Sequence, residues 1–439
     1  MFKKSKFVFV ALAGLLLAGC GGSEVTTSGT GSEDATNKRI SLTVWSSLED
    51  LTLQEELAAE FAEEYAYDPE TNTNYEFKFY FGDVYVDAQK LITQDITTAA
   101  DVFVLPDDQI QVLKTAGALA PFRGAFADDI QENYVASAVS SATLDGEIYG
   151  YPYTADNGYF LYYNSNYLTA EDVASMDAMM TKLDSIDKKF VMDLKNGWYL
   201  PSFFSSTGTL TYDTVTKIQV CDYDNAEGMN NARGFNKLIV DHLVGSESIL
   251  SSGLTGEIAG FQTKDESGNP VEPTIVAGVS GTWDAAALKV AMGDGYAAAK
   301  LPTFTPIDEA GAALEQRQMG SFAGAKVMAV KIQEDAEKLF FAQLLAQYMN
   351  SADAQVRRYI DRNYGPANLA SLESEEVQAD LALQALAAQA PFAMVQSRAV
   401  GGTFWDPMAA FGTAVVEQDF GVDGTLATAL QEAVAAIVG

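Results

Sequence analysis

Cysteine and histidine are nearly absent from this sequence, and their scarcity excludes several kinds of chemistry. The 439 residues include two cysteines, Cys20 and Cys221, and one histidine, His242. These residues suit neither a zinc cluster nor a disulfide framework, and any catalytic imidazole would have to be that of His242. No phosphate-binding motif of the Walker or G-x-G-x-x-G type occurs. We therefore predict no metal ion and no cofactor.

Basic residues are also scarce. There are 27 lysines and arginines against 60 aspartates and glutamates, which gives a net charge of -33. This charge repels nucleic acid and anionic membrane surfaces, so we expect no nucleic-acid partner. The length and the hydrophobic share of 48% indicate a globular protein of about two domains.

No apolar run is long enough to span a bilayer. The run 7–18 follows three lysines and ends in Leu17-Ala18-Gly19-Cys20. This order is typical of a signal peptide, here 1–19, and Leu-Ala-Gly-Cys resembles the lipobox of bacterial lipoproteins. The resemblance implies a lipidated Cys20 and an extracytoplasmic protein anchored to the bacterial cell membrane; the alternative is an ordinary signal peptide with an incidental cysteine. Residues 20–39, rich in Gly, Ser and Thr, are predicted to form a flexible tether.

The body of the chain begins with alternating strand and helix patterns. Apolar residues alternate in 40–44 and 75–81, and 101–105 is almost wholly apolar, so three strands are expected. Between the first two, Thr52-Leu53-Gln54-Glu55 has the form of a capping box before a helical stripe. Further helical stripes occupy 336–348 and 426–437. This order predicts an α/β fold with helices on both faces of a sheet.

Tryptophan is rare, and its placement is informative. Trp198, Trp283 and Trp405 each have a glycine and a polar or acidic residue nearby, whereas Trp45 belongs to the first strand. An indole face with neighbouring carboxylates and amides suits a pyranose ring. Tryptophans also fill cores, so a shared binding site and separate core positions both remain open.

Motifs in consistent order from 40 to 439 resemble the extracellular solute-binding proteins of ABC sugar importers, in the maltose and maltodextrin branch. They are Leu42-Thr43-Val44-Trp45, Ala100-Asp101-Val102-Phe103-Val104 with Pro106-Asp107-Asp108, Gly117-Ala118-Leu119-Ala120-Pro121, Asp145 to Pro152 with Tyr162-Tyr163-Asn164, Thr282-Trp283, Lys300-Leu301-Pro302-Thr303, Tyr364-Gly365-Pro366-Ala367 and Phe404-Trp405. The most specific is Asp145-Gly146-Glu147-Ile148-Tyr149-Gly150-Tyr151-Pro152.

The resemblance implies a class II periplasmic-binding-protein-like fold, in which two lobes, each a sheet flanked by helices, are hinged around a central cleft. The N-terminal lobe would take 40–154 and 302–364, and the C-terminal lobe 157–300 and 367–439. The protein would be a monomer and not an enzyme. It would capture a neutral carbohydrate, such as a maltodextrin, by lobe closure and deliver it to ABC transporter permease subunits in the membrane.

The resemblance also implies the ligand-binding positions. They are Glu49, Asp50, Asp83, Asp108, Asn157, Asn196, Trp198, Trp283, Trp405 and Asp406. The sequence departs from the family pattern where Leu105 replaces an aromatic residue, Gln109 replaces an arginine, Thr282 replaces a proline and no basic residue stands near Asp50. The first lobe is therefore expected to keep its acids but to lack an aromatic platform and cations.

Several alternatives remain open at this point. Glu49, Asp50 and Asp108 could cap helices instead of contacting a ligand. A secreted glycoside-cleaving enzyme would also need paired carboxylates, although no acid here is marked as catalytic. A binding protein for a peptide, a polyamine or an iron complex is the third alternative.

Overall fold

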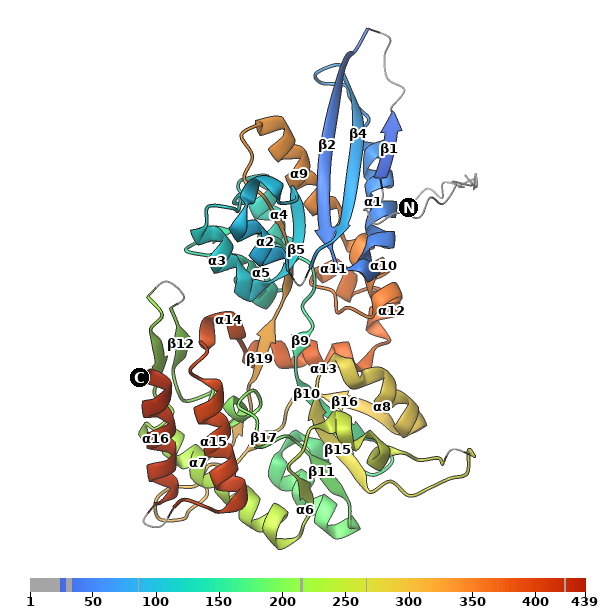
Figure 1. The fold of residues 1–439 in the computed structure, drawn as a ribbon. Helices are drawn as coiled ribbons and strands as arrows, with labels where there is room; N and C mark the ends of the chain where they lie inside the picture. Colours follow the sequence, from blue (N-terminus) through green and yellow to red (C-terminus); the bar gives the residue numbers. More distant parts are fainter. Residues whose placement is uncertain (1–23, 29–33, 86, 214–215, 266, 422–423) are drawn as a thin grey trace.

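The computed structural model describes residues 24–28, 34–85, 87–213, 216–265, 267–421 and 424–439. Two bodies of mixed sheet and helix lie one above the other, and the connecting strands β9 and β19 run between them (Figure 1). Buried side chains form one core in the upper body, the first lobe, and two neighbouring clusters in the lower body, the second lobe. The α/β fold class expected from the sequence is thus observed.

The first lobe is built on a sheet with the strand order β1-β4-β2-β5-β20-β8. β2 and β4 pair in parallel, with Leu42 opposite Phe79, while β20 runs antiparallel to β5. Ile40, Leu42 and Val44 are buried, as their alternation predicts. The strands are β1 Glu24–Ser28, β2 Thr36–Ser46, β3 Tyr67–Asp68, β4 Thr73–Asp83, β5 Val102–Pro106, β8 Tyr151–Pro152 and β20 Lys326–Val330; a small hairpin pairs β6 Thr143–Leu144 with β7 Glu147–Ile148.

Helices surround this sheet. They are α1 Leu51–Glu64, α2 Ala88–Gln94, α3 Ile110–Thr115, α4 Ala125–Asn133, α5 Ala136–Ala142, α9 Ala336–Tyr348, α10 Ala352–Arg362, α11 Leu369–Leu372 and α12 Glu375–Gln378. The capping box predicted at Thr52 is wrong, because α1 already begins at Leu51, and Asp50 at its N-cap makes no side-chain capping hydrogen bond. Gln54 is instead buried and donates hydrogen bonds to Ser46 Oγ and Tyr153 Oη, at 3.0 and 3.3 Å.

The second lobe is built on a sheet with the order β14-β11-β15-β10-β16. These strands are β10 Phe160–Asn164, β11 Lys189–Val191, β14 Ile249–Leu250, β15 Ile275–Ser280 and β16 Tyr296–Ala299, and the hairpins are β12 Leu210–Tyr212 with β13 Gln219–Cys221 and β17 Thr303–Phe304 with β18 Arg317–Gln318. The helices are α6 Met176–Ile186, α7 Ala226–Leu238, α8 Ala285–Met292, α13 Leu381–Gln389, α14 Gln396–Ala399, α15 Trp405–Glu417 and α16 Leu426–Val438. Cys221 is a free, buried thiol whose pKa burial raises to about 11.

A small third sheet joins the lobes. It pairs β9 Asn157–Gly158 and β21 Ala393–Val395 with the central strand β19 Ser321–Gly324. The chain passes between the lobes through β9, between β19 and β20, and between α12 and α13 (Figure 1). Three strands from distant parts of the sequence therefore meet where the lobes are connected.

Two predicted crossings between the lobes need correction. Phe304, Met319 and Phe322 are buried in the second-lobe core, so 302–324 belongs with that lobe and the crossing falls at Ala325. Ala367 is buried in the first-lobe core, and the return to the second lobe comes only before α13. The lobe to which each segment belongs is decided by its apolar contacts, and position in the sequence does not reveal these contacts.

Part of the predicted tether is ordered. Glu24–Ser28 forms β1, which pairs antiparallel with β4, and β2 begins at Thr36. Backbone pairing at a sheet edge needs no large apolar side chain, and the prediction counted only side chains. Cys20 and the segment 1–19 lie outside the described residues. Among the described residues, no helix has the length and apolar character to cross a membrane.

Candidate binding cleft

A cleft of about 550 Å³ lies between the two lobes, where the connecting strands meet. Its volume is in the usual range for a small-molecule site. The lining residues come from three places: Tyr85, Pro106, Asp107, Asp108, Lys326, Arg362, Asn363 and Tyr364 from the first lobe; Thr282, Trp283, Ala286, Gln396 and Ser397 from the second; and Thr154, Asp156, Asn157 and Ala325 from the connections. Both lobes therefore supply polar and aromatic groups to one space.

Trp283 is the aromatic residue of the second-lobe wall. It lies in the turn Thr282–Asp284 after β15, and 48% of its surface is exposed. The turn is fixed from behind because buried Asp284 accepts hydrogen bonds from Ser280 and Thr255, at 2.6 and 2.9 Å. A Cβ on Gly281 would lie 2.0 Å from the Trp283 ring, so glycine is needed where the indole folds over the backbone. The protein thus holds a large apolar face open to the cleft.

Trp198 supports Trp283 from the side. The two ring centroids are 5.6 Å apart, and Trp198 also packs on Tyr159 at 4.8 Å. Its indole Nε1 donates a 2.9 Å hydrogen bond to Oε1 of Gln396, which lines the cleft. Aromatic contacts of this kind restrict ring movement, so Trp198 stiffens the platform that Trp283 presents.

Lys326 lies opposite, on the first-lobe side. Its Nζ is 3.9 Å from the ring centroid of Tyr364 and 5.4 Å from that of Tyr85. No carboxylate oxygen of a described residue lies within 4.0 Å of this ammonium, so its partners are the faces of the two rings. Burial raises the pKa of the Tyr85 phenol well above its usual value, which keeps it a neutral donor. The expected loss of aromatic and cationic groups from this lobe is wrong.

Arg362 links the cleft to two of the predicted acids. Its Nε donates a 3.1 Å hydrogen bond to Asp50 Oδ1, and Nη2 lies 3.9 Å from Glu49 Oε2. Asp50 is 4% exposed and also accepts hydrogen bonds from Ser47 and Tyr153, at 3.0 and 3.1 Å. Its carboxylate is therefore occupied by protein donors, and Asp50 positions Arg362 at the cleft edge.

Three acids line the cleft. Burial raises the pKa of Asp107 to about 6, while hydrogen bonds from Ser141 and Ser397 oppose the shift. The Ser397 hydroxyl donates to Asp107 Oδ2 at 3.0 Å, a contact between the two lobes. Burial also raises the pKa of Asp156, which accepts a 3.0 Å hydrogen bond from the backbone N–H of Gly365, and that of Asp108. These three carboxyl groups are candidate hydrogen-bond partners for a ligand in the cleft.

The predicted site residues fall into three groups. Asp108, Asn157 and Trp283 line the cleft, and Trp198 packs directly behind Trp283. Glu49 and Asp50 lie behind Arg362.

The remaining four are outside the lining. Asp83 is an exposed residue at the end of β4, and Asp406 is exposed in the first turn of α15. Asn196 Oδ1 accepts a 2.9 Å hydrogen bond from the backbone N–H of Trp198 and so shapes its loop. Trp405 packs on Phe322 and Phe404, with ring centroids 5.8 and 5.4 Å away. A Cβ on Gly197 would lie 2.7 Å from the Trp405 carbonyl oxygen, which places that backbone beside the Trp198 loop.

Several lining residues were not predicted from the sequence. They are Tyr85, Asp107, Asp156, Lys326, Arg362, Tyr364, Gln396 and Ser397. Asp107 and Asp156 adjoin predicted residues, so sequence position alone could have suggested them. Lys326 and Tyr364 meet only because β20 and the end of α10 come together in the fold, and no local pattern signals this.

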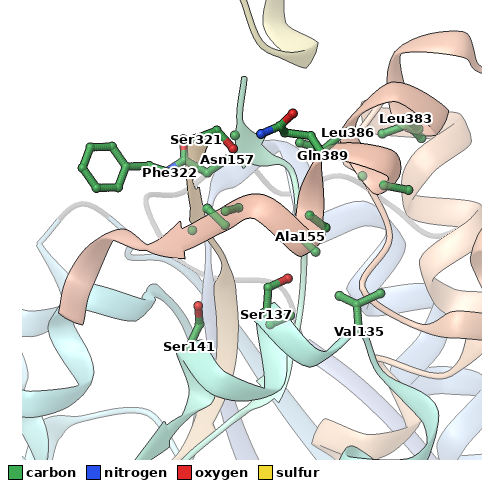
Figure 2. A pocket seen from close by; sticks show the side chains of 18 of the residues that line it. Val135, Ser137, Ser141, Ala155, Asn157, Ser321, Phe322, Leu383, Leu386 and Gln389 are labelled. Atoms are coloured by element: carbon green, nitrogen blue, oxygen red, sulfur yellow. The ribbon is translucent and has the colours of Figure 1, made fainter. Parts of the chain in front are cut away.

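A second, enclosed pocket lies at the connection of the lobes, but it is small. Figure 2 shows Ser137, Ser141 and Val135 of the first lobe on one side and Asn157, Ser321 and Gln389 on the other. Its volume is about 60 Å³, which is room for a few water molecules and not for a sugar. The pocket therefore offers a small void at the connection and no ligand site.

The chain matches, over residues 56–385, the family model described as bacterial extracellular solute-binding protein. It belongs to this family. The match covers most of the body of this solute-binding protein and all of the cleft-lining residues except Gln396 and Ser397. A comparison with curated protein sequences gives no match.

Solved structures with the same fold include three that are similar over almost their whole length. The maltodextrin binding protein MalE1 from L. casei BL23, without ligand, has a TM-score of 0.70 and 21% identity, covering 92% of this chain and 100% of that one. An extracellular solute-binding protein from Staphylococcus aureus in complex with maltose has a TM-score of 0.69 and 16% identity, covering 91% of this chain and 97% of that one. The maltose-binding periplasmic protein MalE from Listeria monocytogenes, in complex with maltose, has a TM-score of 0.65 and 18% identity, covering 91% of this chain and 97% of that one. These likenesses confirm the two-lobe fold.

Proposed function

We propose that this solute-binding protein captures a neutral sugar or oligosaccharide in the interlobe cleft and delivers it to an ABC transporter permease. The main observation behind this proposal is the exposed indole face of Trp283, which Trp198 supports on the second-lobe wall. The opposite wall presents hydrogen-bonding groups. A pyranose has apolar C–H faces and a rim of hydroxyls, and these two walls complement both. Two of the similar structures hold maltose and the third is named a maltodextrin binding protein, which supports the same ligand class here.

Charges in the cleft favour a neutral ligand. Asp107, Asp108 and Asp156 line it together with Lys326 and Arg362, so neither sign dominates. A strongly anionic or cationic ligand would leave part of this set without a counter-charge, which is costly in a partly buried site. Hydroxyl groups can donate to the carboxylates and accept from the cations at once.

A binding panel tests this function. Purified protein is titrated with glucose, maltose and maltotriose, and with a peptide and a polyamine as competitors, while tryptophan fluorescence and heat are recorded. We expect saturable binding of at least one sugar and no signal from the other two classes. New reducing ends after incubation with maltodextrin would instead identify the glycoside-cleaving alternative, for which half-buried Asp107, with its raised pKa, would be the candidate acid.

The membrane anchor is part of the proposal. Cys20 follows the apolar segment in a lipobox-like order. In a bacterial host, the full chain should partition with membranes and incorporate labelled fatty acid, and a Cys20→Ser variant should do neither. Membrane association that survives Cys20→Ser would contradict a lipid attached at this residue.

A further inference from the structure

A second compartment adjoins the main cleft on the side of α3, α14 and the β12 hairpin. It has a volume of about 360 Å³ and lies between the lobes as well. The first lobe contributes Asp107, Asp108, Ile110, Gln111, Ser141, Thr143, Leu144 and Asp145, and the second contributes Thr211, Tyr212, Asp213, Ser397 and Arg398. Asp107, Asp108 and Ser397 line both spaces, so the two compartments share a boundary.

Arg398 is the distinctive residue of this compartment. It lies on α14, and no hydrogen bond or ion pair joins it to any residue that the structure describes. Burial lowers the pKa of its guanidinium, while the nearby carboxylates of Asp107 and Asp145 oppose the shift. A guanidinium carries five N–H donors, and leaving them without acceptors in a partly buried place costs free energy. The donors of Arg398 are therefore available to a ligand.

Two other groups of the lining also lack partners within the described chain. Gln111 donates from Nε2 to Thr115 Oγ1 at 3.1 Å, but its buried Oε1 accepts no hydrogen bond. The Tyr212 ring lies against Gly401, where an added Cβ would be 2.4 Å from it, and the Tyr212 hydroxyl has no described partner. Buried polar atoms in proteins are normally paired, so Gln111 Oε1 is an acceptor that a ligand hydroxyl could satisfy, beside the half-buried donors of Arg398 and Tyr212.

The charges indicate which ligand completes it. Four carboxylates, those of Asp107, Asp108, Asp145 and Asp213, line this compartment with one cation, Arg398, so an anionic ligand would meet carboxylate repulsion. Asp145 is itself paired with Lys114. Hydroxyl groups avoid the repulsion because each can accept from Arg398 and donate to a carboxylate. The lining thus fits an uncharged, hydroxyl-rich group.

We propose that this second compartment binds further sugar units of the same ligand whose first units lie on Trp283. The ligand would then pass beside Asp108, which is exposed and lines both spaces. The protein would favour oligosaccharides over mono- and disaccharides, and Arg398 would set this preference. The inference rests on the proposed sugar-binding function and adds the length of the ligand to it.

The test is a series of chain lengths. Maltose, maltotriose, maltopentaose and maltoheptaose are titrated calorimetrically into the wild type and into Arg398→Met, which keeps the length of the side chain but removes its donors. In the wild type we expect affinity to rise about tenfold or more from maltose to maltoheptaose. Arg398→Met should lose most of that rise: its affinity for maltoheptaose should fall by about tenfold, which is the scale of a lost hydrogen bond to a charged group. Its affinity for maltose should stay within about twofold of the wild type.

Arg233→Met is the matched control. Arg233 lies on α7 of the second lobe, donates to Asn230 at 3.0 Å and lines neither compartment. It should keep the full chain-length series, and equal thermal unfolding of both variants would show that they fold. Tyr212→Phe, which removes one hydroxyl, should reduce the increase in affinity from maltose to maltoheptaose by a few-fold.

Each other result has a definite meaning. Saturable binding with equal affinity for all lengths would overturn the second compartment and leave the proposed function standing. An equal loss for maltose and maltoheptaose in Arg398→Met would also overturn it, because the residue would then act on the main cleft or on closure. No binding of any sugar by the folded wild type would contradict the proposed function itself.

Discussion

The second-lobe wall of the cleft presents an indole platform, whereas the first-lobe wall presents cations held against tyrosine rings. Trp283 offers an apolar face whose attraction for a sugar ring depends on contact area. Lys326 and Arg362 offer directional donors that act only when hydroxyls reach them. The difference suggests that the second lobe supplies most of the initial affinity, while the first lobe fixes orientation once the lobes approach each other.

The largest expected effect follows from removing the platform. Trp283→Ala should weaken sugar binding by about 30-fold or more, since a buried aromatic anchor contributes about 2 kcal/mol or more. Calorimetric titration with the preferred sugar measures the loss. Trp405→Phe is the comparison, because Trp405 packs on Phe322 and Phe404 and does not line the cleft. If Trp405→Phe lost as much affinity as Trp283→Ala, the assignment of the platform to Trp283 would be contradicted.

The next effect concerns Asp107, where the two walls meet. Because burial raises its pKa to about 6, the folded protein holds a proton there that the unfolded chain releases near pH 4. This contribution to the free energy of unfolding is present below about pH 4, falls as the pH rises through roughly 4 to 6, and is absent above. Its size is about 3 kcal/mol, from a shift of about two pKa units.

Urea unfolding across this pH range measures the effect. The high net negative charge adds its own pH dependence, so the readout is the difference between the wild type and Asp107→Asn. Asn can still accept from the Ser397 hydroxyl, and the variant should be more stable than the wild type at pH 7 and should lack the change between pH 4 and 6. Parallel curves for the two proteins would show that Asp107 has an ordinary pKa.

A smaller effect is expected at Lys326. Lys326→Met keeps the apolar stem between Tyr85 and Tyr364 but removes the ammonium, and should weaken sugar binding by about fivefold to tenfold. Lys289→Met, on the exposed side of α8 and outside the cleft lining, is the matched control. A loss of less than twofold in Lys326→Met would mean that the tyrosine rings, and not the charge, form the first-lobe wall.

The two walls also differ in how far the sequence predicts them. Trp283 follows the apolar strand β15 in a glycine-flanked turn; this local pattern made it a candidate, and the family resemblance selected it. Lys326 and Tyr364 carry no such pattern, since their contact depends on β20 pairing with β5 and on α10 ending beside it. The same limit explains Asp50: the family resemblance implied a ligand contact, but Arg362, which is 312 residues away, occupies its carboxylate.

The fold shows the same division between local and distant information. Strand alternation in 40–44 and the helical stripe of α9 predicted the observed elements, because these periods depend only on neighbouring residues. The assignment of 302–324 to the first lobe was wrong because Phe304 and Phe322 pack in the second-lobe core against residues that are distant in the sequence. The edge strand β1 was missed because it is held by backbone pairing with β4, which leaves no apolar pattern in its sequence.

The smallest effect is expected at two acids that the family resemblance implied as ligand contacts and that the geometry places outside the cleft. Asp83 is exposed at the end of β4, and Asp406 is exposed in the first turn of α15. Neither lines the cleft, so Asp83→Asn and Asp406→Asn should each change sugar affinity by less than about twofold, the scale of an exposed charge. Titration at low and moderate salt separates a direct contact from a long-range field, because only the field is screened. A salt-independent loss of tenfold in Asp83→Asn would mean that closure brings β4 onto the ligand, and the first-lobe wall would then extend beyond Lys326 and Arg362.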